Sequence, residues 1–325
     1  MAAEQFIGFL KEEIESKKWD TVVDFAKFKQ DKLVTATPQK VKISPLDSLN
    51  MIGFQMRNAI ISNLSLNSFF LLKCSKIKCS LLKNLYDLLL NTRDAVNKDQ
   101  LAQLIFLLHL SKSKIEEASE WHYFFVKFIS LSHENQIDFS FKESIEKLFD
   151  QLKSNIHVQQ RLKRAVQNIT GEVNLAFDMN KFLINELKLN FVSCEIPGLK
   201  GYAGFNSIFV NIVELFSKYE FINKNDHSAF DILKLEFTRL FVHEVCHVII
   251  RQVLRDINVS TPKLERSKKL NIFEAGIYSE ETFFCKRIDW IASFSSNDLV
   301  ASKIREQLIY KRNNIKPSNK KRIVK

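Results

Sequence analysis

The sequence predicts a predominantly helical α+β protein, in which a helical N-terminal part precedes a part with a small sheet and one long helix. Gly (7) and Pro (5) are scarce among the 325 residues, whereas Phe (28) is abundant. Few helix breakers and many large apolar residues favour long helices around an aromatic-rich core. Apolar residues recur at helical spacing through the first half. An alternation typical of a strand occurs only later, before residue 212.

The first half is expected to be helical throughout. Residues 2–30 carry apolar side chains at helical spacing, and residues 34–46 form a looser stretch that contains Pro38 and Pro45. From about 47 to 165, helical segments follow one another, separated by Asn, Ser, Lys and Asp as caps and turns. These segments are LLKNLYDLLLNT, DQLAQLIFLLHLS, EEASEWHYFFVKFISL and KESIEKLFDQLKSN. We therefore predict a helical domain over residues 1–165.

The pattern changes near Gly171, and a second domain is expected over residues 166–310. After a helix at about 173–188, the segment 191–212 holds three of the seven glycines. Its end, Phe205–Ile212, alternates large apolar residues with others, which indicates a strand with one buried face. A long helix is predicted from about Ser228 to Arg255, and a further helix begins near Asn271.

Charge and cysteine usage restrict the class of protein. The net charge is +11, but the tail 311–325 contains seven Lys and Arg and no acid, which leaves +4 for the rest. Such a tail is expected to be disordered, and it is the only segment through which we expect the protein to contact nucleic acid. Five cysteines without a C-x-x-C pair predict neither a disulfide framework nor a zinc ribbon. No signal peptide or membrane-spanning run is recognised, so we expect an intracellular, cytoplasmic protein, with the tail as a potential nuclear address.

The predicted long helix contains the segment His243-Glu244-Val245-Cys246-His247. Residues i and i+4 share one face of a helix, so His243 and His247 can present two imidazole nitrogens to one zinc ion. Glu244 lies beside them, where it can act as general base on a zinc-bound water and then protonate the leaving group. Zinc lowers the pKa of such a water to about 7. This spacing therefore predicts a hydrolytic zinc site.

A catalytic zinc needs a third protein ligand. No His follows His247, so a downstream ligand must be a carboxylate or Cys285. The downstream carboxylates are Asp256, Glu265, Glu274, Glu280, Glu281 and Asp289. We select Glu274, because apolar residues flank it and because Gly276 would allow the zinc helix to approach closely. Glu280 and Glu281 are the alternatives.

Other residues are candidates for further roles around this site. An oxyanion of the transition state needs a hydrogen-bond donor near the metal. The candidate donors are Tyr202, Tyr278, His227 and Arg251. Cys246 is expected to pack as a small hydrophobic residue, and Cys194 has no companion motif that would make it an upstream ligand.

His243-Glu244-x-x-His247 with a Glu on a later helix resembles the gluzincin branch of HExxH zinc metallopeptidases, over about residues 200–290. The resemblance implies a zincin-like domain in which His243, His247 and Glu274 bind zinc and Glu244 acts on the water. It also implies that an edge strand before the zinc helix, here Phe205–Ile212, binds a peptide by strand addition. The gap of 27 positions from His247 to Glu274, and Glu-Ala-Gly in place of Asn-Glu-x-x-x-Asp, depart from the family pattern.

The expected function is accordingly a zinc metallopeptidase with one Zn²⁺ per chain, which hydrolyses peptide bonds in a peptide or protein substrate. The alternative is a non-catalytic helical interaction protein that retains a zincin fold, with nucleic-acid contact through the basic tail. No membrane span is expected in either case.

Overall fold

The computed structural model describes residues 49–67, 79–90, 96–113, 115–133, 139–171, 184–223, 229–259 and 274–284, together with residues 11 and 70. The expectations for residues 2–30 (residue 11 apart), 34–46, 173–183 and the tail 311–325 lie outside these described residues. The helices are α2 (Leu49–Leu66), α4 (Cys79–Leu90), α5 (Lys98–Leu110), α6 (Ala118–Ser130), α7 (Phe139–Ser154), α8 (Ile156–Gly171), α9 (Ile212–Asn223), α10 (Ala229–Leu254) and α12 (Ala275–Phe284). The strands are β1 (Ser132–His133), β2 (Lys188–Ser193), β3 (Gly201–Ala203) and β4 (Ser207–Asn211). The prediction of a mostly helical protein with a small sheet is confirmed.

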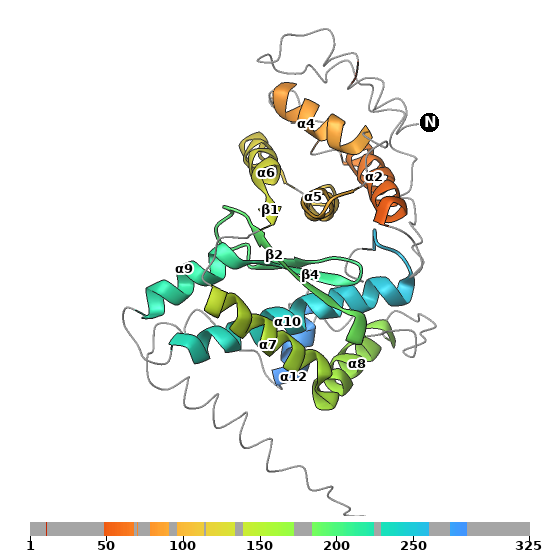
Figure 1. Cartoon of the computed structure of the whole chain (residues 1–325). Coiled ribbons are helices and arrows are strands. Elements are labelled where there is room, and N and C mark those ends of the chain that lie inside the picture. Colours follow the sequence, from red (N-terminus) through yellow and green to blue (C-terminus); the bar gives the residue numbers. More distant parts are fainter. Residues whose placement is uncertain are drawn as a thin grey trace, which may run out of the picture.

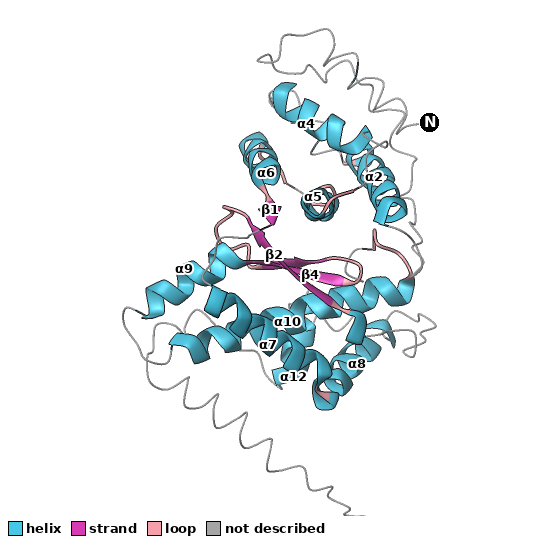
Figure 2. Ribbon diagram, viewed as in Figure 1, coloured by secondary structure: helices cyan, strands magenta, loops and turns pink. Residues whose placement is uncertain are grey.

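The described elements form three layers, with the sheet in the middle (Figures 1 and 2). We call α2, α4, α5 and α6 the first helical layer, and α7, α8, α9, α10 and α12 the second helical layer. Each layer packs on one face of the sheet and encloses its own hydrophobic core. The first core is rich in aromatic rings, as expected: Trp121 stacks on Phe125 at 6.0 Å between ring centroids and meets Phe70 edge-on at 5.0 Å.

The sheet has the order β1-β2-β4-β3, with β2 and β4 parallel and the two outer pairs antiparallel. All five residues of β4 are buried. Phe209 faces the first core, whereas Ile208 and Val210 face the second. The expectation of a strand with a single buried face at this position was therefore wrong, because helices cover both faces of the sheet.

The prediction of a helix at about 173–188 was also wrong for the C-terminal end of this range. Residues 184–186 form one short 3₁₀ turn, and β2 begins at Lys188. This strand pairs in parallel with β4, from Lys188 opposite Ser207 to Val192 opposite Asn211. A parallel partner is distant in the chain, so the pairing leaves little local signal in the sequence.

The second helical layer brings together segments from both predicted domains. The expected division at residue 165 falls inside α8. Phe149 of α7 meets Phe241 of α10 edge-on at 5.8 Å, and Arg161 Nη1 of α8 donates to Phe283 O of α12 at 2.8 Å. Helices α7 and α8 thus contribute to the core that surrounds the motif helix.

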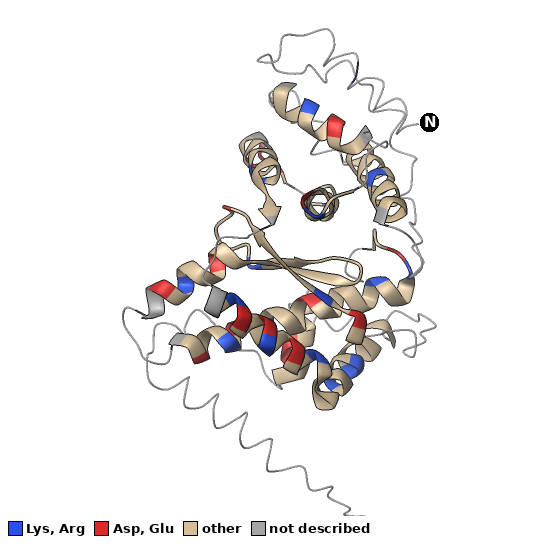
Figure 3. Ribbon diagram, in the orientation of Figure 1, with Lys and Arg blue, Asp and Glu red and all other residues tan. Residues whose placement is uncertain are grey.

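Charged residues occur mostly on the helices of the second layer, and few occur on the strands (Figure 3). On α7, Lys147 pairs with Glu143 at 2.8 Å and Lys153 pairs with Asp150 at 3.2 Å. Such exposed pairs contribute little stability. Among the described helices, none combines the length and the apolar character needed to cross a bilayer.

Candidate metal centre

Helix α10 supports the motif on a rigid, buried platform. The helix spans 26 residues, and its residues Val242, Val245, Cys246, Val248 and Ile249 have no exposed surface. The imidazole rings of His243 and His247 project together, with centroids 5.3 Å apart. Their side chains keep 24% and 17% of their surface exposed, so an ion can reach both rings from solvent.

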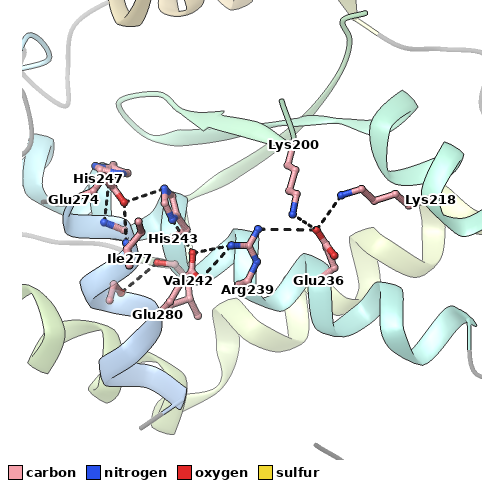
Figure 4. A network of polar contacts seen from close by, with 12 residues as sticks. Lys200, Lys218, Glu236, Arg239, Val242, His243, His247, Glu274, Ile277 and Glu280 are labelled. Atoms are coloured by element: carbon pink, nitrogen blue, oxygen red, sulfur yellow. Dashed lines mark hydrogen bonds and ion pairs between the residues drawn. The ribbon is translucent and has the colours of Figure 1, made fainter. Parts of the chain in front are cut away.

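Glu274 completes the cluster from the start of α12. Its Oε1 accepts from the Gly276 amide at 2.9 Å and its Oε2 from the Ile277 amide at 2.8 Å, so it caps the helix. Oε1 also lies 2.5 Å from His247 Nε2, and Oε2 lies 3.5 Å from His243 Nε2 (Figure 4). The ligand atoms of the three residues all lie within 4.8 Å of one another, and no other such group occurs among the described residues.

The charges around Glu274 favour its ionised form. Burial raises the pKa of this carboxyl, but the hydrogen bond from His247, the charges of both histidines and the Gly276 amide together lower it to about 2. The position at a helix N-terminus has the same effect, because the helix dipole stabilises an anion there. Glu274 is therefore an anionic oxygen donor between two imidazoles.

Gly276 allows α12 to approach the motif helix. A Cβ atom at this position would lie 2.5 Å from the Cδ2, Cε1 and Nε2 atoms of His243. Such a distance is far inside van der Waals contact, so any side chain would displace the ring or the helix. The expectation that Gly276 permits a close approach is confirmed.

Glu280, one of the alternatives for the third ligand, contacts the other side of His243. Its Oε1 lies 2.8 Å from His243 Nδ1, and both its oxygens lie 3.2 Å from Arg239 Nη1. A ring that donates Nδ1–H to a carboxylate keeps Nε2 free as a metal ligand. Glu280 therefore orients His243 and lies outside the ligand cluster, as does the half-buried Glu281.

The environment of His243 favours the charged ring when no metal is bound. Burial lowers the pKa of His243, but the hydrogen bond to Glu280 and the charges of Glu244, Glu274 and Glu280 raise it to about 9. Metal binding must therefore displace a proton from this ring.

A line of ion pairs continues along α10 from the site (Figure 4). Arg239 Nη2 lies 4.0 Å from Glu236 Oε1, and this oxygen also pairs with Lys218 at 3.2 Å and with Lys200. Glu236 is 1% exposed, and burial raises its pKa, but the hydrogen bond and the charge of Lys200 and the other cations lower it overall. Sequence reasoning missed Arg239 and Glu236, although their positions four and seven residues before His243 place them on the face of the motif.

Glu244 lies beside the two histidines and is 7% exposed. Among the described residues, none forms a hydrogen bond or ion pair with its carboxylate. Its charge acts on Arg251. Burial lowers the pKa of Arg251 to about 10, and the negative charge of Glu244 offsets part of this effect. A carboxylate that structural contacts leave available can accept a proton.

Two of the four oxyanion candidates make contacts with other groups. Tyr202 points into the first core, where its hydroxyl donates to Ala102 O at 3.2 Å and burial raises its pKa. Arg251 is buried and donates to the carbonyls of Ala203 and Gly204 at 2.5 and 2.9 Å. Of the four candidates, Tyr278 remains: it is half-buried and lies one turn after Glu274, whereas His227 lies outside the described residues.

The described residues among the remaining candidate ligands do not join the cluster. Cys246 is fully buried with its sulfur 3.5 Å from Ala275 O, and it packs as expected. Cys194 is buried in the first core, and burial raises its pKa to about 11. Asp256 accepts from the Asn258 amide at 2.9 Å. Glu265, Cys285 and Asp289 lie outside the described residues.

The strand expected to bind substrate is an interior strand. β4 is paired on both sides, so its backbone cannot accept another strand. Among the described strands, the edge of the sheet next to α10 is β3. In the β3–β4 pair, Asn211 N donates to Lys200 O and Gly204 N to Ser207 O. Because inward and outward residues alternate in an antiparallel pair, Gly201 and Ala203 direct their backbone groups away from β4.

Two imidazoles and one carboxylate are a donor set typical of catalytic zinc sites. The short separations, the capped carboxylate and the oriented His243 ring fit such an ion. No family model, no curated protein and no solved structure matches this chain.

Proposed function

We propose that this protein is a zinc-dependent metallopeptidase. The observation that carries the proposal is the cluster of His243, His247 and Glu274, with their ligand atoms within 4.8 Å of one another and Glu244 adjacent in the chain. Helix α10 and the residue that caps α12 supply these groups, and Gly276 lets the two helices meet closely at this point. Such convergence is what a metal site requires of a fold.

Each residue has a distinct role in the proposed reaction. The Nε2 atoms of His243 and His247 and the carboxylate of Glu274 would hold zinc, which when bound acidifies a water and polarises a carbonyl. The Glu244 carboxylate takes the proton of the attacking water and delivers it to the leaving amide nitrogen. Glu280 accepts a hydrogen bond from His243 Nδ1–H and keeps this ring in one orientation.

The edge of β3 supports a peptide as the substrate. Gly201 directs its backbone groups outward, whereas the outward carbonyl of Ala203 is already bound by Arg251. Helix α10 lies beside Gly201, with the Leu240 methyl groups 3.4 Å from the Cβ position of this glycine. An extended peptide can form backbone hydrogen bonds with such an edge. This location replaces the one expected from the sequence, on β4.

The first experiment measures bound metal and cleavage on the full chain. We expect about one zinc per chain by elemental analysis, and cleavage within a quenched-fluorescence peptide library. Glu244→Gln should retain zinc but lower turnover by about 10²–10⁴-fold, because it removes the proton acceptor and leaves the ligands. Glu281→Gln is the control, since Glu281 lies outside the cluster.

The results separate the two functions considered. Failure to bind zinc, both as purified and after zinc addition, would reject the metal site. Zinc binding with no cleavage in the wild type would favour a non-catalytic interaction protein. Equal turnover of the wild type and the Glu244→Gln variant would remove Glu244 from the mechanism.

A further inference from the structure

The two helical layers meet at the free end of β3. The Ala203 carbonyl accepts from Arg251 Nη1 of α10 at 2.5 Å and lies 3.0 Å from His109 Nε2 of α5. The Arg251 Nη2 and His109 Nε2 atoms are 3.1 Å apart. Because Ala203 directs its carbonyl away from β4, these side chains close the edge of the sheet at this residue.

Arg251 links this edge to the motif helix. It lies one turn after His247 and two turns after Glu244, on the same face of α10. Its guanidinium is 4% exposed and also donates to Gly204 O at 2.9 Å. Buried guanidinium groups are stable only when their donors are paired. Arg251 therefore ties the C-terminal end of β3 to α10.

His109 is the contribution of the first helical layer to this contact. Burial and the charge of Arg251 lower its pKa well below the ordinary value, so the ring is neutral. A neutral imidazole can accept a hydrogen bond from the cationic Arg251. An apolar residue would fill the same space but would leave Arg251 with one partner fewer.

We propose that His109 is a positioning residue for peptide binding: its Nε2 accepts from Arg251, and Arg251 in turn holds the Ala203 carbonyl, so that β3 keeps its place beside α10. This inference rests on the proposed function, and it gives the first helical layer a role in the site. His109 would act through Arg251 and β3, and it would touch neither the metal nor the substrate.

The test compares His109→Leu with His109→Gln in the full chain. Leu fills space without hydrogen bonding, whereas Gln retains a polar group of similar reach. We expect His109→Leu to raise KM for the cleaved library peptide at least about tenfold with kcat changed less than about threefold, because a displaced edge strand weakens substrate and transition state equally. His109→Gln should restore much of the loss. Zinc affinity should remain unchanged in both variants.

Hydrogen exchange supplies a readout independent of catalysis. Exchange across residues 199–206 should accelerate in His109→Leu and return toward the wild-type rate in His109→Gln. Tyr202→Phe is the matched control: it removes the hydrogen bond that the Tyr202 hydroxyl of β3 donates to Ala102 O of α5, without touching Arg251. It should leave KM near the wild-type value.

The outcomes distinguish this inference from the proposed function. Wild-type protein that binds zinc but cleaves nothing would overturn the proposed function and this inference with it. Wild-type cleavage with an unchanged KM in His109→Leu would overturn only this inference. Equal losses in His109→Leu and His109→Gln, or an equal loss in Tyr202→Phe, would assign His109 to packing and also reject the positioning role.

Discussion

The Nδ1 atom of His243 lies 2.8 Å from Oε1 of Glu280, an acid 37 positions later on a different helix. Arg239 holds this carboxylate from its other side. The contact fixes which nitrogen of His243 faces Glu274 and His247. In metal sites, a ligating histidine commonly donates its other ring N–H to a carboxylate or a carbonyl. Here that carboxylate belongs to Glu280, which is itself one of the alternative ligands expected from the sequence.

Replacing Glu280 should weaken metal binding without removing a ligand. We expect Glu280→Gln to lower zinc affinity by about 10–100-fold, the usual effect of losing a carboxylate behind a ligating histidine. Competition with a chromophoric chelator measures this affinity. Glu281→Gln is the matched control on the same helix, and it should bind zinc as the wild type does. A loss of the same size in both variants would contradict the role assigned to Glu280.

Gly276→Ala should damage the metal centre through a steric clash. The added methyl would lie 2.5 Å from three atoms of the His243 ring. We expect reduced zinc affinity and a loss of about 1–3 kcal/mol in the free energy of unfolding, the usual range for overpacking. Gly171→Ala is the control, because a Cβ there meets nothing within 4 Å. Denaturant unfolding and zinc titration on both variants decide the matter; wild-type values for Gly276→Ala would refute the close approach.

The metal-free protein should lose stability toward both acid and base. The pKa of Glu274 is lowered to about 2, so its contribution is present above its ordinary value near 4.5 and is lost as pH falls from there toward 2. The pKa of His243 is raised to about 9, so its contribution is present below 6.5 and is lost as pH rises toward 9. Urea unfolding across this range measures both effects. Glu274→Gln should reduce the loss of unfolding free energy between pH 4.5 and 2, because this variant has no carboxyl to protonate. An unchanged pH dependence in this range would argue against the ion pair between Glu274 and the histidines.

Removing the buried carboxylate of Glu236 should destabilise the second helical layer. Lys200, Lys218 and Arg239 surround this group, and without it three cations would face one another in a partly buried space. We expect Glu236→Gln to lower the free energy of unfolding by about 3 kcal/mol, as breaking buried ion pairs does. Glu220→Gln, at an exposed position on α9, should change it by less than about 0.5 kcal/mol. Chemical denaturation of both variants provides the comparison.

The long helix and the paired histidines could be predicted from the sequence, because both depend on local spacing. The helix expected from about Ser228 to Arg255 runs from Ala229 to Leu254. His243 and His247 share a face because a helix turns every 3.6 residues, whatever surrounds it. No His stands between His247 and Lys325, so the expectation of a carboxylate as third ligand also needed no knowledge of the fold.

Only the tertiary structure decided which acid faces the histidines and which strand is free. Glu274, Glu280 and Glu281 occur within eight residues of sequence, and their roles differ because α12 begins at Ala275 and crosses α10 at Gly276. Likewise, β4 is interior because β2 pairs with it in parallel and β3 pairs on its other side. Contacts between distant segments depend on the packing of both partners, and the local pattern of either one does not encode them.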